Sequence, residues 1–152
     1  MTDVAAPLRV IPLGGLGEIG MNLMVYECGD DAILVDCGMM FPDAATLGVD
    51  VIVPDMTYIF DNASKIRALF LTHGHEDHIG AVPFLVERLP SIPIYGMPLA
   101  LGFVSDKLDE FGIEGIDLRT IQPREVVEAG AFRVEAIRVT HSIVDALAYA
   151  IA

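Results

Sequence analysis

The chain has 152 residues, 53% hydrophobic and 20% charged, with a formal net charge of −13. These values fit one globular domain with a substantial core and exclude an intrinsically disordered chain. The acidic balance also lacks the basic footprint that is typical of nucleic-acid binders. No apolar run reaches the roughly 18 residues of a membrane helix, and residues 1–4 do not begin a signal peptide. We therefore expect a cytoplasmic protein with no membrane partner.

The N-terminal third is expected to form strands. Residues 8–13 read as a strand that runs into a glycine-rich loop at 14–20. Residues 22–28 and 32–36 read as two further strands, and the short acidic turn between them predicts a hairpin. Residues 37–50 contain proline, aspartate and glycine and are expected to form a loop.

The glycine-rich loop at 14–20 invites comparison with a dinucleotide-binding fingerprint. That fingerprint opens a helix, whereas a strand follows here, so the dinucleotide interpretation is rejected. Two interpretations remain. The loop is either a tight turn, or a segment whose backbone N–H groups approach a substrate or shape the rim of a site.

The rest of the chain alternates helices with short strands. Helices are expected at 62–67, with Asn62 as N-cap, at 79–88, and at 98–111. Strands are expected at 51–53, 68–72, 93–95, 117–121, 125–127, 132–139 and 146–151. Such alternation after a β-rich start predicts an α/β fold with helices on at least one face of a sheet. Because the chain stops inside its last strand, we expect the domain to be incomplete.

Three histidines fall within six residues, immediately after the apolar strand at 68–72. Neutral imidazole is the commonest nitrogen ligand of zinc, and carboxylates complete such sites. The spacing lets His73 and His75 reach one ion, while Asp77 and His78 turn toward a second ion close by. Two ions about 3.5–4 Å apart can together clamp the attacking and leaving oxygens of a hydrolysis. The segment therefore predicts a two-metal hydrolase site.

Two further residues stand at strand ends. His141, the only histidine outside the segment, follows the strand at 132–139 and is expected to be the third ligand of the first ion. Asp36 is either a turn residue or a group that orients a ligand histidine through its free N–H. Glu76, between the ligands, is expected to face solvent or to begin a helix.

These residues carry a resemblance to a known family. The run His-Gly-His-Glu-Asp-His at 73–78 resembles the HxHxDH motif of the metallo-β-lactamase superfamily, and Asp36 and His141 match its first and third motifs. A narrower likeness is to ribonuclease J, a member of the β-CASP branch. It rests on residues 12–22, 36–38, 72–80 and 140–143.

The resemblance implies which residues serve each metal ion. His73, His75 and His141 would bind the first zinc. Asp77 and His78 would contribute to the second zinc and to catalysis.

The resemblance also implies a fold. It is the metallo-β-lactamase αββα sandwich, here as the N-terminal part of the domain, in which Asp36 supports the metal ligands. The family's bridging aspartate and its β-CASP domain would follow residue 152. We therefore expect residues 1–152 to be a metallo-β-lactamase domain with a firm first metal site and a weak second one.

The implied activity is zinc-dependent hydrolysis of RNA, both endonucleolytic and from 5′ to 3′, by a homo-oligomer when the protein is full length. The 152 residues alone are expected to be weakly active or inactive. Manganese or magnesium could replace zinc, because His/Asp sites accept several divalent ions. Two alternatives remain: a small-molecule hydrolase of the same superfamily, such as a thioesterase or lactamase, and a non-catalytic metal-binding module.

Overall fold

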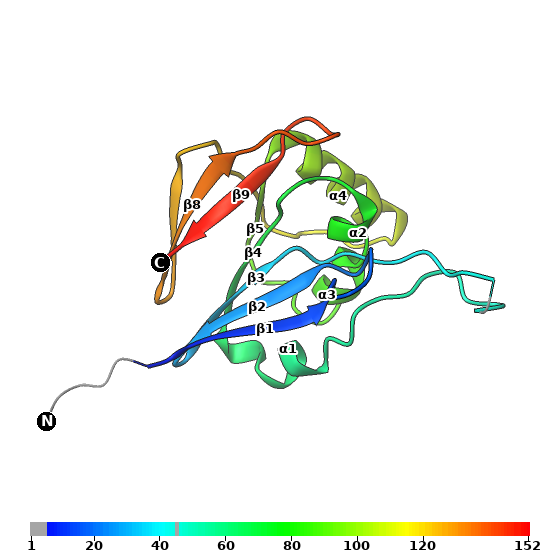
Figure 1. Cartoon of the computed structure of the whole chain (residues 1–152), viewed down its shortest axis with the longest axis horizontal. Coiled ribbons are helices and arrows are strands. Elements are labelled where there is room, and N and C mark those ends of the chain that lie inside the picture. The colour runs from blue at the N-terminus through cyan, green and yellow to red at the C-terminus, as the bar shows by residue number, and fades with distance from the viewer. Residues whose placement is uncertain (1–5, 45) are drawn as a thin grey trace, which may run out of the picture.

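The structure is a computed structural model that describes residues 6–44 and 46–152. The expectation that no signal peptide is present falls on residues outside this part. The described residues form a six-stranded sheet, a three-stranded sheet and a set of helices (Figure 1). In this part of the chain no helix has the length and apolar character needed to cross a bilayer.

The larger sheet is mixed. Its first three strands are antiparallel neighbours, and from the third strand onward all neighbours are parallel. The predicted hairpin is therefore confirmed. The strands, in spatial order, are β1 (Leu8–Gly14), β2 (Leu23–Cys28), β3 (Asp31–Val35), β4 (Ile66–Phe70), β5 (Ile94–Gly96) and β6 (Leu118–Thr120).

The smaller sheet is antiparallel and lies against one face of the larger one. Alternation along β4 sends Ala68 and Phe70 toward this sheet, where they pack with Phe132 and Val134. Leu69, between them, joins the core on the opposite face. The strands are β7 (Val126–Ala129), β8 (Phe132–Arg138) and β9 (Leu147–Ile151).

Helices cover the other face of the large sheet (Figure 1). α4 (Pro98–Glu110) matches the prediction: proline occupies its first turn, and Gly112 just beyond its end has a φ of 66°. Helices, large sheet and small sheet thus make three layers. This confirms the predicted α/β metallo-β-lactamase architecture, whose second helical layer is not among the described residues.

The predicted helix at 79–88 is wrong in its bounds. Two short helices, α2 (Glu76–Ile79) and α3 (Val82–Val86), stand in its place. The break occurs because the N–H of Ala81 donates to Cys37 O, outside the helix, at 2.9 Å. Pro83 has no N–H to continue the ladder. Asp77 and His78 lie on the first of these helices, α2.

The predicted helix at 62–67 is also wrong. A helix, α1 (Thr57–Asp61), precedes Asn62, and a single 3-10 turn (Ala63–Lys65) follows it. The Asn62 side chain donates to Tyr58 O at 2.9 Å, so it stabilises a helix end and does not cap a helix start. Asp55 accepts from the N–H of Thr57 instead.

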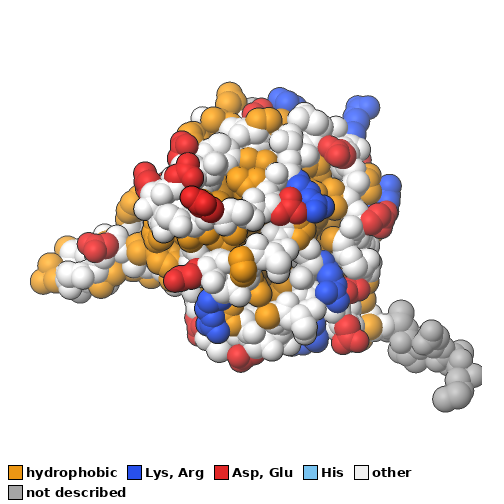
Figure 2. Space-filling model, turned by 180° about the vertical axis from the view of Figure 1, so that it is seen from behind, with side chains coloured by type: hydrophobic (Ala, Val, Ile, Leu, Met, Phe, Trp, Pro, Cys, Tyr) orange, Lys and Arg blue, Asp and Glu red, His pale blue; other side chains and the backbone are white. Residues whose placement is uncertain are grey.

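A long connection between β3 and α1 projects from the body of the molecule (Figures 1 and 2). An isolated bridge between Met40 and Ile52 closes its base. Beyond this bridge the connection carries exposed apolar side chains, including Phe41 and Leu47. The predicted loop at 37–50 and the extended piece at 51–53 are therefore confirmed for the described residues.

Candidate metal centre

His73, His75 and His141 meet at the edge where β4 ends. His73 and His75 follow β4, and their Nε2 and Nδ1 atoms lie 3.0 Å apart. His141 comes from the connection between β8 and β9, and its ring centroid is 4.5 Å from that of His73. One nitrogen of each residue lies within 4.8 Å of the others, which is close enough to hold one metal ion. We call these residues the three-histidine cluster.

The docking of β9 brings His141 to the cluster. The N–H of Leu147, at the start of β9, donates to Thr72 O at 2.8 Å. The hydroxyl of Tyr149 donates to Leu71 O at 2.7 Å. Both acceptors lie in the extended segment between β4 and His73, so the two sheets are joined directly beside the cluster.

The His73 side chain is suited to bind a cation. Burial, together with His78, His141 and His75 nearby, lowers its pKa from 6.5 to about 4. It is therefore neutral at pH 7. Its Nδ1 lies 2.9 Å from Thr72 Oγ1, and a proton donated there leaves the lone pair on Nε2, facing His75.

Asp77 and His78 form a second, adjacent pair of donor groups. His78 Nε2 and Asp77 Oδ2 are 3.5 Å apart, and the rings of His78 and His73 are 4.1 Å apart. We call these residues the Asp77/His78 pair. It presents one nitrogen and one oxygen, whereas the cluster presents three nitrogens.

Asp36 holds the other side of the His78 ring. Its Oδ2 lies 2.8 Å from His78 Nδ1. Burial disfavours the charged imidazole, but the hydrogen bond and negative charge of Asp36 outweigh it, so the pKa of His78 is raised. Asp36 is itself buried and also accepts from the N–H of Thr72 at 2.8 Å. Of the two interpretations of Asp36, this geometry favours the group that orients a histidine.

Backbone hydrogen bonds fix the Asp77/His78 pair to the N-terminal half of the chain. Asn22 N donates to Asp77 O at 3.0 Å, and Cys37 N donates to His78 O at 2.8 Å. Gly38 N donates in turn to Asn22 O at 3.0 Å. Only glycine fits at position 38, because a Cβ there would lie 1.6 Å from Asp77 O.

Residues 17–141 match the metallo-beta-lactamase superfamily. The chain belongs to this superfamily. Its fold agrees with that of a protein of unknown function from Enterococcus faecalis V583, with a TM-score of 0.73 at 18% identity, covering 95% of this chain and 40% of that one.

Curated relatives in the superfamily bear the name ribonuclease J. The chain is 47% identical to ribonuclease J of Synechocystis sp. over 146 residues, which are 95% of this chain and 23% of the relative. It is 44% identical to ribonuclease J of Helicobacter pylori over 148 residues, which are 96% of this chain and 21% of the relative. The chain therefore spans less than a quarter of the length of these two relatives.

The structure adds two side chains, Thr72 and Asn22, to the candidate site. The sequence alone did not assign them to it. Thr72 places its hydroxyl within 3.0 Å of both Asp36 carboxylate oxygens and of His73 Nδ1. Asn22 contacts Asp77 and His78 through its amide nitrogen. Both residues directly adjoin expected features, a strand end and a glycine loop. That position was the signal that could have drawn attention to them.

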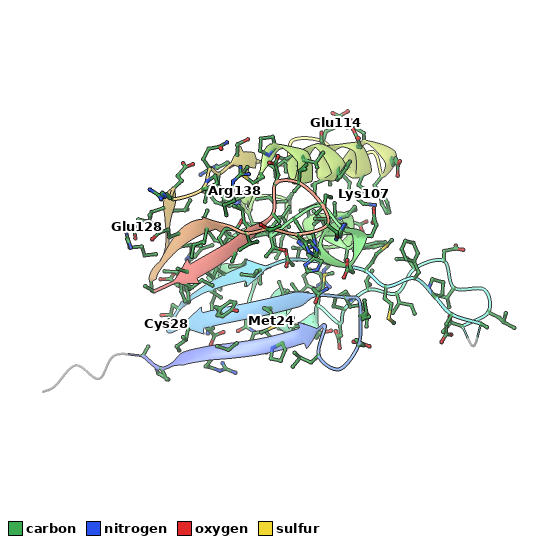
Figure 3. All side chains as sticks on the ribbon, turned by 45° about the horizontal axis from the view of Figure 1, so that its top comes forward. Met24, Cys28, Lys107, Glu114, Glu128 and Arg138 are labelled. Carbon is green, nitrogen blue, oxygen red and sulfur yellow. The ribbon has the colours of Figure 1, made fainter. Side chains whose placement is uncertain are left out.

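Glu76 is the first residue of α2, which confirms one of the two positions expected for it. It also pairs with Lys107 on α4, whose Nζ lies 2.8 Å from Glu76 Oε2. Figure 3 shows this lysine at the end of the molecule where α4 and α2 lie together, so the ion pair joins the turn that carries Asp77 and His78 to α4.

An open cavity of about 330 Å³ lies between the two sheets beside the histidines. Its volume falls in the range of small-ligand pockets. It is lined by Asp36, Thr72, His73, His78, Val139, Thr140, His141, Ala146 and Leu147.

The glycine-rich loop lies next to Asp77, at a second hollow in the surface. This smaller hollow is bordered by Gly20, at the end of the loop, by Phe41 and by Asp77. This position favours the interpretation that the loop shapes the rim of the site.

Proposed function

We propose that this chain carries the metal centre of a zinc-dependent ribonuclease of the ribonuclease J type, which hydrolyses RNA phosphodiester bonds internally and from the 5′ end. The supporting observation is the pairing of the three-histidine cluster with the adjacent Asp77/His78 pair. It occurs in a chain 44–47% identical to proteins of that name. Because those proteins are about four times longer, the activity is proposed for the whole protein, and the 152 residues alone would be weakly active or inactive.

In this proposal the donor groups divide between two ions. His73, His75 and His141 hold the first, and Asp77 and His78 contribute to the second and to catalysis. Bound divalent ions supply Lewis acidity and make water acidic enough to act as a nucleophile near pH 7. A set of imidazoles and one carboxylate favours zinc, and manganese or magnesium is the alternative for the oxygen-richer second position.

The surrounding residues hold protons where this chemistry requires them. Asp36 accepts the Nδ1 proton of His78 and so leaves the Nε2 lone pair facing Asp77. Thr72 does the same for His73. The rings of His73 and His78 are thereby held in one tautomer and one orientation before an ion arrives.

The substrate proposal must account for the charge of the chain. At −13, the chain repels a polyanion over most of its surface. Cations in the site would reverse that sign where the phosphodiester binds. The remaining contacts to RNA would come from the rest of the full-length protein, which we propose to be a cytoplasmic homo-oligomer.

A substrate comparison tests the proposal. The full-length gene product is incubated with 5′-monophosphorylated RNA, with a thioester and with a β-lactam, each with and without a chelator. We expect chelator-sensitive cleavage of RNA. Turnover of the thioester or the lactam alone would establish a small-molecule hydrolase, and metal binding without turnover of any substrate would establish a non-catalytic module.

A further inference from the structure

We propose that Asn22 is a positioning residue of the second metal site, because its side-chain amide holds the Asp77 carboxylate beside the His78 ring, where a metal ion can reach both. The inference rests on the proposed two-metal function and adds to it a residue outside the histidine segment. Asn22 stands at the end of the glycine-rich loop, just before β2.

One amide group reaches three acceptor atoms. Asn22 Nδ2 lies 2.9 Å from Asp77 O, 3.2 Å from Asp77 Oδ2 and 3.3 Å from His78 Nε2. The backbone oxygen takes one hydrogen of the NH₂ group. The second hydrogen is within reach of Asp77 Oδ2, and a carboxylate oxygen keeps a lone pair for an ion while it accepts this bond.

The protonation of His78 agrees with this arrangement. Asp36 accepts the proton on Nδ1, so Nε2 of the neutral ring carries one lone pair, which an ion would take in place of the 3.3 Å contact with the amide. If the Asn22 amide were turned over, its oxygen would face Asp77 O, the Asp77 carboxylate and the His78 lone pair, all of them acceptors. The hydrogen bonds therefore fix the orientation of the amide as well as that of the ligands.

The spacing that results suits a shared ion. Two donors about 2.0–2.2 Å from one tetrahedral zinc lie about 3.4 Å apart, and Asp77 Oδ2 and His78 Nε2 are 3.5 Å apart. Groups that hydrogen-bond to ligating carboxylates and histidines typically change metal affinity by about 10–100-fold when they are removed. Asn22 contacts both ligands of the pair.

Removal of the side chain should leave the local backbone intact. The bonds from Asn22 N to Asp77 O and from Gly38 N to Asn22 O involve main-chain atoms only. Asn22→Ala therefore tests the amide, and Asn22→Leu tests it with a similar side-chain volume. Asn62→Ala is the matched control, since it removes another 2.9 Å bond from a half-buried side-chain amide to a main-chain oxygen.

Zinc titration of the chain, followed by the imidazole ¹⁵N resonances, reports the two sites separately. His78 reports the second site, and His73, His75 and His141 report the first. We expect Asn22→Ala and Asn22→Leu to weaken the zinc response of His78 at least about tenfold. The first site should change less than twofold, and Asn62→Ala should change neither.

Three results would overturn the inference: an unchanged His78 response in both variants, equal weakening of both sites, or no zinc response of His78 in the original chain. The first site distinguishes this failure from failure of the proposed function. Zinc that binds the three-histidine cluster normally, with His78 unaffected by Asn22, would refute only the role of Asn22. Absence of zinc from both sites would refute the metal-dependent function itself.

Discussion

The two halves of the candidate metal centre are built in different ways. The three-histidine cluster joins His73 and His75, beside the large sheet, to His141, from the small sheet. The Asp77/His78 pair lies on one short helical turn, held by backbone bonds from Asn22 and Cys37. The first therefore depends on how two sheets dock, and the second depends on the local packing of loops around one turn.

The two halves therefore differ both in the number of donor atoms they offer to a metal ion and in the residues that hold those atoms in place. The cluster supplies three nitrogen ligands, as a catalytic zinc site does, and its geometry depends on β9. The pair supplies two donors, and its geometry depends on Asp36, Asn22 and Gly38. Substitutions should therefore damage one half without the other.

The largest separation is expected from His141→Ala. Loss of one of three ligands should reduce zinc affinity at the cluster by more than about 100-fold. The Asp77/His78 pair should keep its affinity, because its hydrogen bonds and ring contacts within the described residues do not include His141. Zinc competition with a chromophoric chelator measures the first effect, and the His78 imidazole resonance measures the second. Equal losses at both sites would show that the two halves are one cooperative unit.

Gly38→Ala should break the opposite half. The added Cβ would overlap Asp77 O, so the backbone must shift, at a cost of about 3 kcal/mol in unfolding free energy. Gly102→Ala is the control, since nothing lies within 4 Å of a Cβ there and α4 should gain about 0.5–1 kcal/mol. Urea denaturation gives both values. Full stability of Gly38→Ala would contradict the close approach of these two segments.

Asp36→Asn should affect one histidine of the pair and spare the cluster. The neutral amide lacks the negative charge that stabilises the imidazolium, so the pKa of His78 should fall. The pKa of His73, set by burial and by its histidine neighbours, should stay near 4. Titration of the metal-free chain by NMR gives both. A His78 pKa unmoved by Asp36→Asn would rule out the proposed orienting role.

The smallest effect should be the pH dependence of stability without metal. His73 has a folded pKa near 4, below its usual value of 6.5. The unfolded chain therefore binds the extra proton first, and stability should fall by about 1–2 kcal/mol as the pH drops from 6.5 toward 4. His78 opposes this, since its raised pKa stabilises the fold at low pH and that contribution is lost as the pH rises. His73→Gln should flatten the acid side of the curve, and an unchanged curve would contradict the pKa of His73.

Much of this organisation could be predicted from the sequence. Apolar runs gave the strands of both sheets, and Pro98 and Gly112 marked the start and end of α4. The histidine spacing gave the cluster, including the distant His141, because few histidines were available and each stood at a strand end.

The remainder depended on contacts that no local pattern encodes. The helix expected at 79–88 breaks because Ala81 bonds to Cys37, more than forty residues earlier in the chain. Asn22 and Thr72 enter the site through side-chain hydrogen bonds set by the packing of three segments. Their own neighbours in the sequence suggested only a strand start and a strand end.

The bond from the Tyr149 hydroxyl to Leu71 O, which spans 78 residues, has a consequence for folding order. During synthesis, every residue that hydrogen-bonds to Asp77 or His78 has emerged once the chain passes Ala81, whereas His141 cannot be fixed in place until β9 exists. Loop closure of that length is slow compared with local pairing. The nascent chain should therefore form the Asp77/His78 pair first. The three-histidine cluster should form only when the two sheets pack together.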